Sequence, residues 1–346
     1  FSPSNSPNAY IYTKSYTPTD VSLHGCIVEM SYEKGFWEVV RIRSDRARDV
    51  ATGGYFGNDY KVAEITWLNY MDILPLEHLW DGVTGEYFVK AKDDIYNAQT
   101  AVTSYVKSKR IETLKNSNWV IDIASGKGQD LRRYFYANIK NLLAIDKDRT
   151  ALTELIQRKY DIIKNPNVPK NTAVHILATD INDPYTTSIK QIISSTSFKP
   201  KTADAVVCNL AIHYFISSVE SMRNFIVLVK NLLAYDGIVV ITFLIGDIVH
   251  KKFIDNKIKV NQSWDIRENE SLKYSIKRLY THEKLEDAGQ KIGILLPFSD
   301  GQYYEEYLVN AQVLITNFES HKFVKESLMT IASRIPEFEI QDRGRH

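Results

Sequence analysis

Cysteine is scarce in this sequence, and the charges of the two signs balance. Cys26 and Cys208 are its only cysteines, they lie far apart, and neither stands at metal-ligand spacing, which predicts a reducing compartment and no metal site. The net charge is +1, so a global basic field is excluded and any nucleic-acid site must be local. No apolar run is long enough to cross a bilayer, so we expect no membrane partner.

A start signal is also missing. The first residues, FSPSNSPNAY, contain neither an initiator methionine nor an apolar leader, which predicts a piece cut from a longer chain. The 346 residues, with 44% apolar and 25% charged side chains, are typical of a globular protein with one main domain and a second unit.

Two units follow from the pattern along the chain. GCIVEM and FWEVVRIR, within residues 21–48, predict a hairpin whose turn covers Tyr32 to Gly35. A glycine-rich loop at 51–59 then leads into helical periodicity from Tyr60 to Trp80, and we place a domain boundary at residue 60. A further amphipathic helix is predicted over 95–114.

Apolar strands then alternate with helices. Strands are predicted at 119–124, 141–146, 173–180, 203–210 and 237–244, and helices from about 129, at 149–160, near 189 and at 219–234. This alternation predicts an α/β fold, a mostly parallel sheet with helices on both faces. Beyond Asn256 we predict a strand at 272–280 and a helix at 305–320.

The loop after the first of these strands is the default ligand site of such a sheet. Its sequence, ASGKGQ, fails the Walker A pattern because Lys127 is followed by Gly128 rather than Ser or Thr. It also matches the dinucleotide fingerprint poorly, with Ala124, Gly126 and Gln129 at the glycine positions.

Carboxylates at successive strand ends indicate a cationic ligand instead. Asp122 and Asp130 flank the loop and favour an ammonium over a pyrophosphate. Asp146 ends the second strand, where it can accept ribose hydroxyls, and Asp180 ends the third, within reach of an adenine amino group. S-adenosylmethionine fits this set. The alternative is that each Asp is a helix N-cap.

The same residues resemble a known family. VIDIASGKGQDL is similar to V-L-D-L-x-C-G-K-G-G-D-L of the mRNA cap guanine-N(7) methyltransferases, especially the multifunctional capping enzymes of large DNA viruses of the African swine fever virus type. CNLAIHYF resembles their Q-F-x-L-H-Y-x-F, and EEYLV resembles P-E-Y-L-V. IYNAQTAVTSYVKSKRIE resembles a segment ending N-N-x-I-K-S, with Thr103 and Ser104 in place of asparagines.

The resemblance implies two sets of site residues. The S-adenosylmethionine pocket would be lined by Lys107, Ala124, Asp146, Asp180, Asn209 and Tyr214, with Asp122, Gly126 and Asp130 added by the loop argument. The cap and RNA would be held by Lys127, Arg133, Arg158, His213 and Glu306.

Each cap residue also has a structural alternative. His213 suits a satisfied core histidine, and Arg133 and Arg158 suit solvated helix faces. Glu306 lies beside Glu305 in a predicted helix, where acidic pairs are common. Phe338 is the only candidate for an aromatic that the family places near its C-terminus, against the guanine.

The front of the chain resembles the end of the OB domain of RNA guanylyltransferases. Trp37, Arg41, Arg43, Asp45 and Arg46 fill its W-x-x-x-R-x-R-x-D-K pattern, with Arg for the final Lys. The nucleotidyl-lysine motif K-x-D-G is absent from the sequence. We therefore expect residues 1–60 to be a partial OB-fold tail and linker, and residues 61–346 to be the methyltransferase domain.

The implied function is transfer of a methyl group from S-adenosylmethionine to the N(7) of the RNA cap guanosine, by in-line displacement without a general base, releasing S-adenosyl-L-homocysteine. Implied partners are capped RNA, other domains of the same polypeptide and a stimulatory subunit, in the cytoplasm at viral replication sites or packaged in the virion. Two alternatives stay open: a class I methyltransferase acting on another RNA base, a protein or a small molecule, and a non-catalytic RNA-binding domain.

Overall fold

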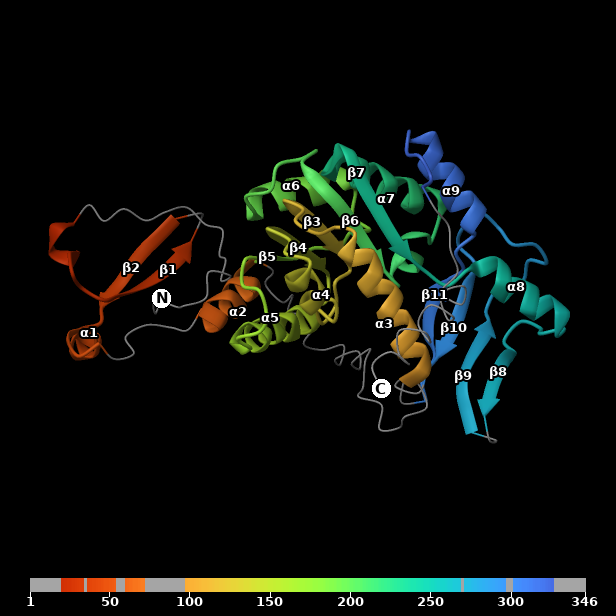
Figure 1. Ribbon diagram of the computed structural model, residues 1–346, viewed down its shortest axis with the longest axis horizontal. Coiled ribbons are helices and arrows are strands. Elements are labelled where there is room, and N and C mark those ends of the chain that lie inside the picture. The colour runs from red at the N-terminus through yellow and green to blue at the C-terminus, as the bar shows by residue number, and fades with distance from the viewer. Residues whose placement is uncertain are drawn as a thin grey trace.

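The computed structural model describes residues 20–33, 36–53, 60–71, 97–268, 271–296 and 301–326. Its main element is a five-stranded parallel sheet of order β5-β4-β3-β6-β7 (Figure 1). These strands are β3 (Trp119–Ile123), β4 (Asn141–Asp146), β5 (Ala173–Ala178), β6 (Ala203–Asn209) and β7 (Leu233–Thr242). The predicted α/β class is confirmed. Because the strand order reverses at β3, the crevice beyond its carboxyl end is the expected ligand site.

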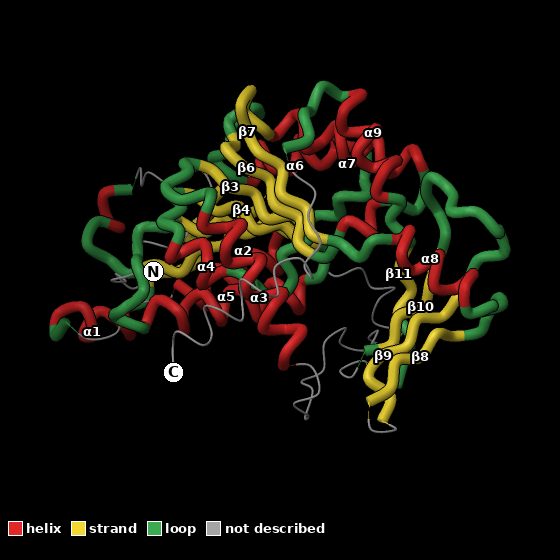
Figure 2. Tube along the Cα trace, turned by 45° about the vertical axis from the view of Figure 1, so that its right-hand side comes forward, coloured by secondary structure: helices red, strands yellow, loops and turns green. Residues whose placement is uncertain are grey.

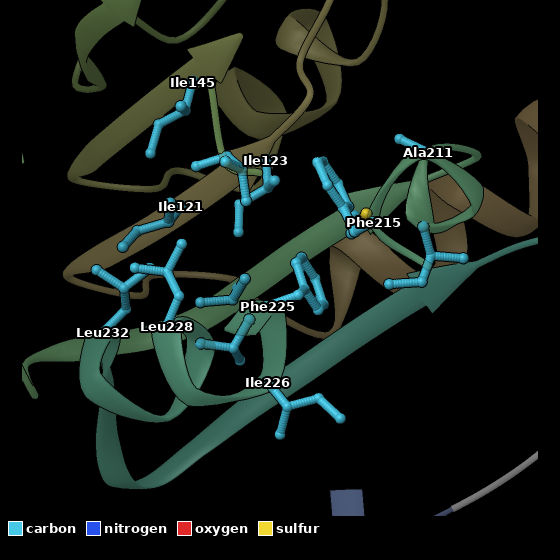
Figure 3. Packing of buried hydrophobic residues seen from close by; sticks show 14 of the residues in the cluster. Ile121, Ile123, Ile145, Ala211, Phe215, Phe225, Ile226, Leu228 and Leu232 are labelled. Carbon is cyan, nitrogen blue, oxygen red and sulfur yellow. The ribbon is translucent and has the colours of Figure 1, made fainter. Parts of the chain in front are cut away.

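Helices cover both faces of this sheet, as the apolar runs predicted. One face carries α2 (Tyr60–Met71), α3 (Asn97–Glu112), α4 (Leu131–Tyr136) and α5 (Arg149–Lys164). The other carries α6 (Tyr185–Ser195), α7 (Val219–Leu232) and α9 (Ala311–Ser320). In Figure 3, Ile121 and Ile123 of β3 pack against Phe225, Leu228 and Leu232 of α7. Apolar packing therefore covers both faces of the sheet.

A second, antiparallel sheet lies beside the first, in the order β11-β10-β9-β8 (Figure 2). Its strands are β8 (Ser263–Glu268), β9 (Ser271–Arg278), β10 (Lys291–Leu295) and β11 (Tyr304–Tyr307). Helix α8 (Gly246–Asp255) buries Val249 and Phe253 against Ile276 and Ile292 of this sheet. The two sheets meet where Ile245 bridges Val309.

The helix predicted over 305–320 is wrong in its first part. Tyr304–Tyr307 forms β11, paired antiparallel with β10, and the helix begins only at Ala311, after Asn310 caps it by accepting from the Val313 N–H. Short apolar runs fit strand and helix equally well, and here pairing with a neighbouring strand decides.

The N-terminal hairpin is confirmed. β1 (Val28–Glu33) pairs antiparallel with β2 (Phe36–Ile42), followed by the short helix α1 (Ala47–Ala51). Tyr32 and Trp37 of the hairpin contact Trp67 and Tyr70 of α2, with ring centroids 5.1–6.4 Å apart. Aromatic packing thus connects the hairpin to α2.

Helix α2 is in turn fastened to the main domain by a buried ion pair. Lys159 of α5 is fully buried, and its Nζ lies 2.6 and 2.5 Å from the two carboxylate oxygens of Glu64. Within the described ranges, no helix has both the length and the apolar character needed to cross a bilayer.

Candidate methyl-transfer site

The loop from Ala124 to Gln129 has an unusual backbone. Ala124, Gly126 and Gly128 all have positive φ, at 56°, 50° and 66°. A Cβ at Gly128 would lie 2.7 Å from Leu155 and 2.8 Å from Leu131, so the sequence needs glycine there. Ala124 holds the same left-handed conformation despite its side chain, a local strain typical of functional sites. The loop therefore turns sharply at the carboxyl end of β3, where the Ser125 N–H donates to the Ile145 carbonyl and the Gly128 N–H to the Ser125 carbonyl.

Asp146, at the end of β4, anchors this loop. Its carboxylate accepts from the Gly126 N–H at 2.7 Å and from the Asp148 N–H at 2.9 Å. Burial raises its pKa, while the two backbone donors act in the opposite direction. Asp146 is therefore a half-buried carboxylate held rigidly beside the loop.

Asp130 is the centre of a polar network that joins four elements. Its carboxylate contacts Lys107 Nζ of α3 at 3.0 Å and accepts from Asn209 Nδ2, at the end of β6, at 3.0 Å. Thr242, at the end of β7, donates through its hydroxyl to the side-chain oxygen Oδ1 of Asn209 at 2.9 Å. Thr242 was not anticipated from the sequence, although its strand-end position beside β6 was a usable signal. Three predicted cofactor residues thus share one network.

Asp122 lies buried behind Asp130. Its burial, and next the Asp130 carboxylate, raise the Asp122 pKa well above its ordinary value. The same burial and the same two carboxyls raise the pKa of the Tyr134 hydroxyl. A cation bound here would relieve the repulsion between the carboxylates, which agrees with the predicted preference for an ammonium.

The helix-cap explanation does not account for these acids. α5 is capped by Asp148, which accepts from Ala151 N–H, and α6 begins after Pro184. Asp130 precedes α4 but its side chain makes no capping bond. Asp180 is partly exposed, accepts from the Asn182 N–H at 2.9 Å and lies 3.6 Å from Lys147 Nζ. Helix capping therefore does not explain why carboxylates lie at the strand ends.

Arg133 makes a different set of contacts from the predicted one. Its Nε donates to Ser108 Oγ at 2.8 Å, its Nη1 to Asp130 at 2.5 Å and to the Gln129 carbonyl at 3.3 Å, and its Nη2 to both the hydroxyl and the carbonyl of Ser104. A guanidinium has five N–H donors, and all five are used. In this arrangement Arg133 fastens α3 to α4 and has no donor left for a phosphate.

His213 and Glu306 come together across 93 positions of sequence. His213 lies in the short helix Ile212–Phe215 after β6, Glu306 lies on β11, and His213 Nε2 is 3.5 Å from the Glu306 carboxylate. Both are buried, and Tyr214 stacks edge-on against His213 with ring centroids 4.1 Å apart. Glu305 points the other way, to Lys291 at the surface. The pair lies where the two sheets meet.

His213 is neutral at neutral pH. Burial lowers its pKa to about 4, so its approach to Glu306 is not an ion pair, and Nε2 has no hydrogen-bond partner in the described part of the chain. A buried polar atom without a partner is uncommon and suggests a missing ligand.

The two other predicted cap residues lie on α5 or beside it. Lys127 leaves the loop and pairs with Glu154 at 2.8 Å. Arg158 is exposed, in a groove that also contains Arg132. Phe338 lies outside the described residues. In the same described ranges, no cluster of His, Cys, Asp or Glu is placed to hold a metal ion.

Acidification should lower the free energy of unfolding because His213 is buried in its neutral form. With its folded pKa near 4 and its unfolded pKa near 6.5, the unfolded chain binds the proton first, so the free energy of unfolding falls as pH drops through this window, by about 3 kcal/mol for this group. Urea titrations at pH 7 and pH 4 of the wild type and of His213→Asn measure the effect.

Asp122 and Asp146 act in the opposite direction, because their raised pKa values stabilise the fold on acidification. Both residues are present in the wild type and in His213→Asn, so their contributions cancel when the two proteins are compared. An identical loss in the variant would show that His213 is not the group responsible.

The sheet order, the loop with left-handed residues and the carboxylates at the strand ends together define a class I methyltransferase. Residues 97–294 match the model of the mRNA (guanine-N(7))-methyltransferase domain, and the chain belongs to this family. The resemblance stated from the motifs is thereby confirmed.

Curated relatives are viral capping enzymes. The "mRNA-capping enzyme" of African swine fever virus (isolate Pig/Kenya/KEN-50/1950) is 41% identical over 98% of this chain and 40% of its own length. The "Probable mRNA-capping enzyme" of Acanthamoeba polyphaga mimivirus is 24% identical over 88% of this chain and 30% of its own. The "mRNA-capping enzyme catalytic subunit" of Fowlpox virus is 25% identical over 69% of this chain and 27% of its own length. The chain thus spans less than half the length of these relatives.

Solved structures are more distant. A putative S-adenosylmethionine dependent methyltransferase from Listeria monocytogenes is 17% identical over 72% of this chain and 94% of that one, with a TM-score of 0.44. This likeness is too low to bear on substrate or mechanism.

Proposed function

We propose that this chain methylates the cap guanine of RNA at N(7) without a general base, with the guanine held between the His213–Glu306 pair and the carboxylates at the strand ends. The observation that carries this proposal is the convergence of His213 and Glu306, both buried, at the junction of the two sheets. A carboxylate accepts from the Watson–Crick edge of guanine, and an imidazole and a neighbouring tyrosine offer ring faces to the base.

The residues around the loop fit S-adenosylmethionine. The Ser125 hydroxyl is buried and has no hydrogen-bond partner among the described residues, and it lies in the loop between Ala124 and Gly126, which both have positive φ. Asp146 is positioned to accept ribose hydroxyls, and Asp180 to accept the adenine amino group. We assign Asp130 and Lys107 to the amino-acid end of S-adenosylmethionine. There Asp130 would attract the ammonium and Lys107 the carboxylate. When bound, the cofactor supplies an electrophilic methyl group.

The residues of the chain need only bind and orient. Guanine N(7) carries a free lone pair, so no proton has to be removed before attack. His213, kept neutral by burial, adds no positive charge that would repel the methyl donor. The rate then comes from alignment and from the exclusion of water by the junction of the two sheets.

Glu306→Ala should lower kcat/KM for capped RNA roughly 100-fold, because it removes charge-assisted hydrogen bonds worth about 3 kcal/mol to the guanine. S-adenosylmethionine affinity, measured by calorimetry, should stay unchanged. Glu305→Ala is the matched control, since Glu305 lies on the other face of β11 and pairs with Lys291 at the surface. Equal losses in the two variants would contradict the assignment of Glu306.

Transfer of labelled methyl to four acceptors tests the function itself: guanosine-capped RNA, adenosine-capped RNA, already methylated cap and free GTP. Transfer confined to unmethylated guanosine acceptors is expected. Transfer to another base, a protein or a small molecule would favour the alternative methyltransferase. Failure to bind S-adenosylmethionine would leave only the non-catalytic RNA-binding domain.

The names of the relatives support further domains or subunits as partners. We propose that residues 1–60 are the tail of a guanylyltransferase OB domain, that residues 61–346 form the methyltransferase, and that capped RNA passes between domains of one polypeptide at cytoplasmic sites of viral replication. A stimulatory subunit is part of this proposal. In the hairpin, Arg41 and Arg43 pair with Glu29, and Arg43 also pairs with Asp45.

A further inference from the structure

An open groove runs along α5 next to α4, on the helical layer that begins at the methyl-transfer loop. Its volume is about 440 Å³, and it is lined by Arg132 at the start of α4, by Glu154, Arg158 and Asp161 of α5, and by the apolar Ile162 and Val168. Arg158 is among the residues that the family resemblance assigns to the cap and RNA, whereas Arg132 is not, and no residue of the groove belongs to the network around Asp130 or to the His213–Glu306 junction.

The charge of the groove is positive once its internal pairs are counted. Glu154 is neutralised by Lys127 at 2.8 Å, and Asp161 by Lys164 at 3.3 Å. Arg132 and Arg158 are both exposed, and among the described residues neither pairs with a carboxylate. Two guanidinium groups are therefore available to an anion, and a guanidinium is well matched to a phosphate.

An exposed aromatic ring lies beside one of these cations. The Arg132 guanidinium lies 5.6 Å from the ring centre of Tyr136 and approaches its hydroxyl at 3.4 Å. Tyr136 is 49% exposed, so its ring is open to solvent. Phosphate-binding cations next to an open aromatic face are the combination that single-stranded nucleic acid uses, with phosphates on the cations and a base on the ring.

Lys127 connects the methyl-transfer loop to one residue of the groove wall. This lysine lies in the loop after β3 and pairs with Glu154, which lines the groove. The neighbouring Arg133 has all five donors occupied, so Arg132 and Arg158, not Arg133, offer free donors on this side of the loop. A chain of phosphates leaving the site past Lys127 would next meet these two arginines.

We propose that this groove binds the RNA chain behind the cap, with Arg132 and Arg158 each pairing one phosphodiester and Tyr136 stacking on a base. The proposal rests on the proposed function, because the capped end must lie at the methyl-transfer site. It adds a subsite for the RNA body, which a cap dinucleotide would not fill, and so predicts that longer capped RNA is the better substrate.

Arg132→Glu tests it, with the double variant Arg132→Glu/Arg158→Glu as the stronger form. For capped RNA of about 20 nucleotides we expect KM to rise roughly tenfold in the single variant, with kcat and the KM for S-adenosylmethionine unchanged. For the cap dinucleotide GpppA the single variant should behave as wild type. Arg223→Glu, an exposed arginine of α7 on the opposite face of the sheet, is the matched control.

Binding of labelled RNA, followed by fluorescence anisotropy over a range of salt concentrations, gives a readout that does not need catalysis. Loss of two phosphate contacts should make the slope of log K against log salt about 1.4 units shallower in the double variant, and loss of one about 0.7. The charge-neutral Arg132→Gln should show a smaller effect than Arg132→Glu, and thermal melts should match the wild type because both arginines are exposed.

Equal losses on the dinucleotide and on the long RNA would overturn the proposal, by placing these arginines at the cap triphosphate. RNA binding and a salt slope that stay unchanged in the arginine variants would also overturn it. An acidic peptide would then be the ligand that fits the positive charge of the groove. If the wild type methylates no capped acceptor but the anisotropy still depends on Arg132 and Arg158, the proposed function fails while the RNA groove stands.

Discussion

Glu64→Gln is expected to lower the free energy of unfolding at pH 7 by about 3–5 kcal/mol, because it removes the carboxylate that pairs with the buried Lys159 ammonium. Burial already lowers the pKa of Lys159, and Glu64 opposes that shift. Without Glu64 the folded pKa falls further below the unfolded value near 10.4, so the loss should shrink as pH rises toward 10. Urea unfolding at pH 7 and pH 9.5 measures both effects.

Two controls separate this charge effect from packing. Glu64→Leu/Lys159→Met replaces the pair by apolar side chains and should recover most of the stability. Asp161→Asn breaks the exposed pair with Lys164 on the same helix and should cost less than about 1 kcal/mol. A loss below 1 kcal/mol in Glu64→Gln would show that α2 does not dock on α5 in solution.

The Glu64–Lys159 pair also helps to place the start of the methyltransferase domain. Helix α2 precedes residue 97, where the family match starts, yet Glu64 lies against a core residue of α5 and Leu68 is part of the core beneath α4 and α5. This supports the proposed boundary near residue 60. Since Trp67 and Tyr70 also contact the hairpin, α2 is the element through which the N-terminal unit is connected to the catalytic one.

The sheet was predictable because its strands are buried on both faces and read as continuous apolar runs. The bounds of β4 match the prediction at both ends, and β3, β5 and β6 match within two residues. The carboxylates were predictable for a related reason: parallel strands end at one edge, so Asp122, Asp146 and Asp180 had to lie near the same crevice.

The long-range pairs were not predictable from pattern. Glu64 and Lys159 each read as ordinary helix charges, and only the packing of α2 on α5 buries them. Arg132 and Arg133 are adjacent and chemically identical in the sequence. The helix directs Arg133 to the serines of α3 and Arg132 to the groove. The closeness of His213 and Glu306 was implied by resemblance alone, since strand β11 had been assigned to a helix.

Asp146→Ala should weaken S-adenosylmethionine binding by at least 100-fold. The carboxylate is predicted to accept two ribose hydroxyls, and charge-assisted hydrogen bonds contribute about 1.5–3 kcal/mol each. The variant also releases the Gly126 N–H, which Asp146 holds at 2.7 Å, so the loop loses its anchor to β4. Isothermal calorimetry with S-adenosylmethionine and with S-adenosyl-L-homocysteine measures the loss, and both ligands should be affected equally because they share the ribose.

Asp148→Ala is the matched control, two residues along the chain. Asp148 caps α5 through the Ala151 N–H, so its loss should cost about 1 kcal/mol of stability and leave cofactor affinity intact. Asp146→Asn keeps one acceptor and the contact with the loop, and should lie between wild type and alanine. Unchanged cofactor binding in Asp146→Ala would move the cofactor away from the end of β4, and the roles given to Asp130 and Lys107 would fall with it, because all three were assigned to one bound molecule.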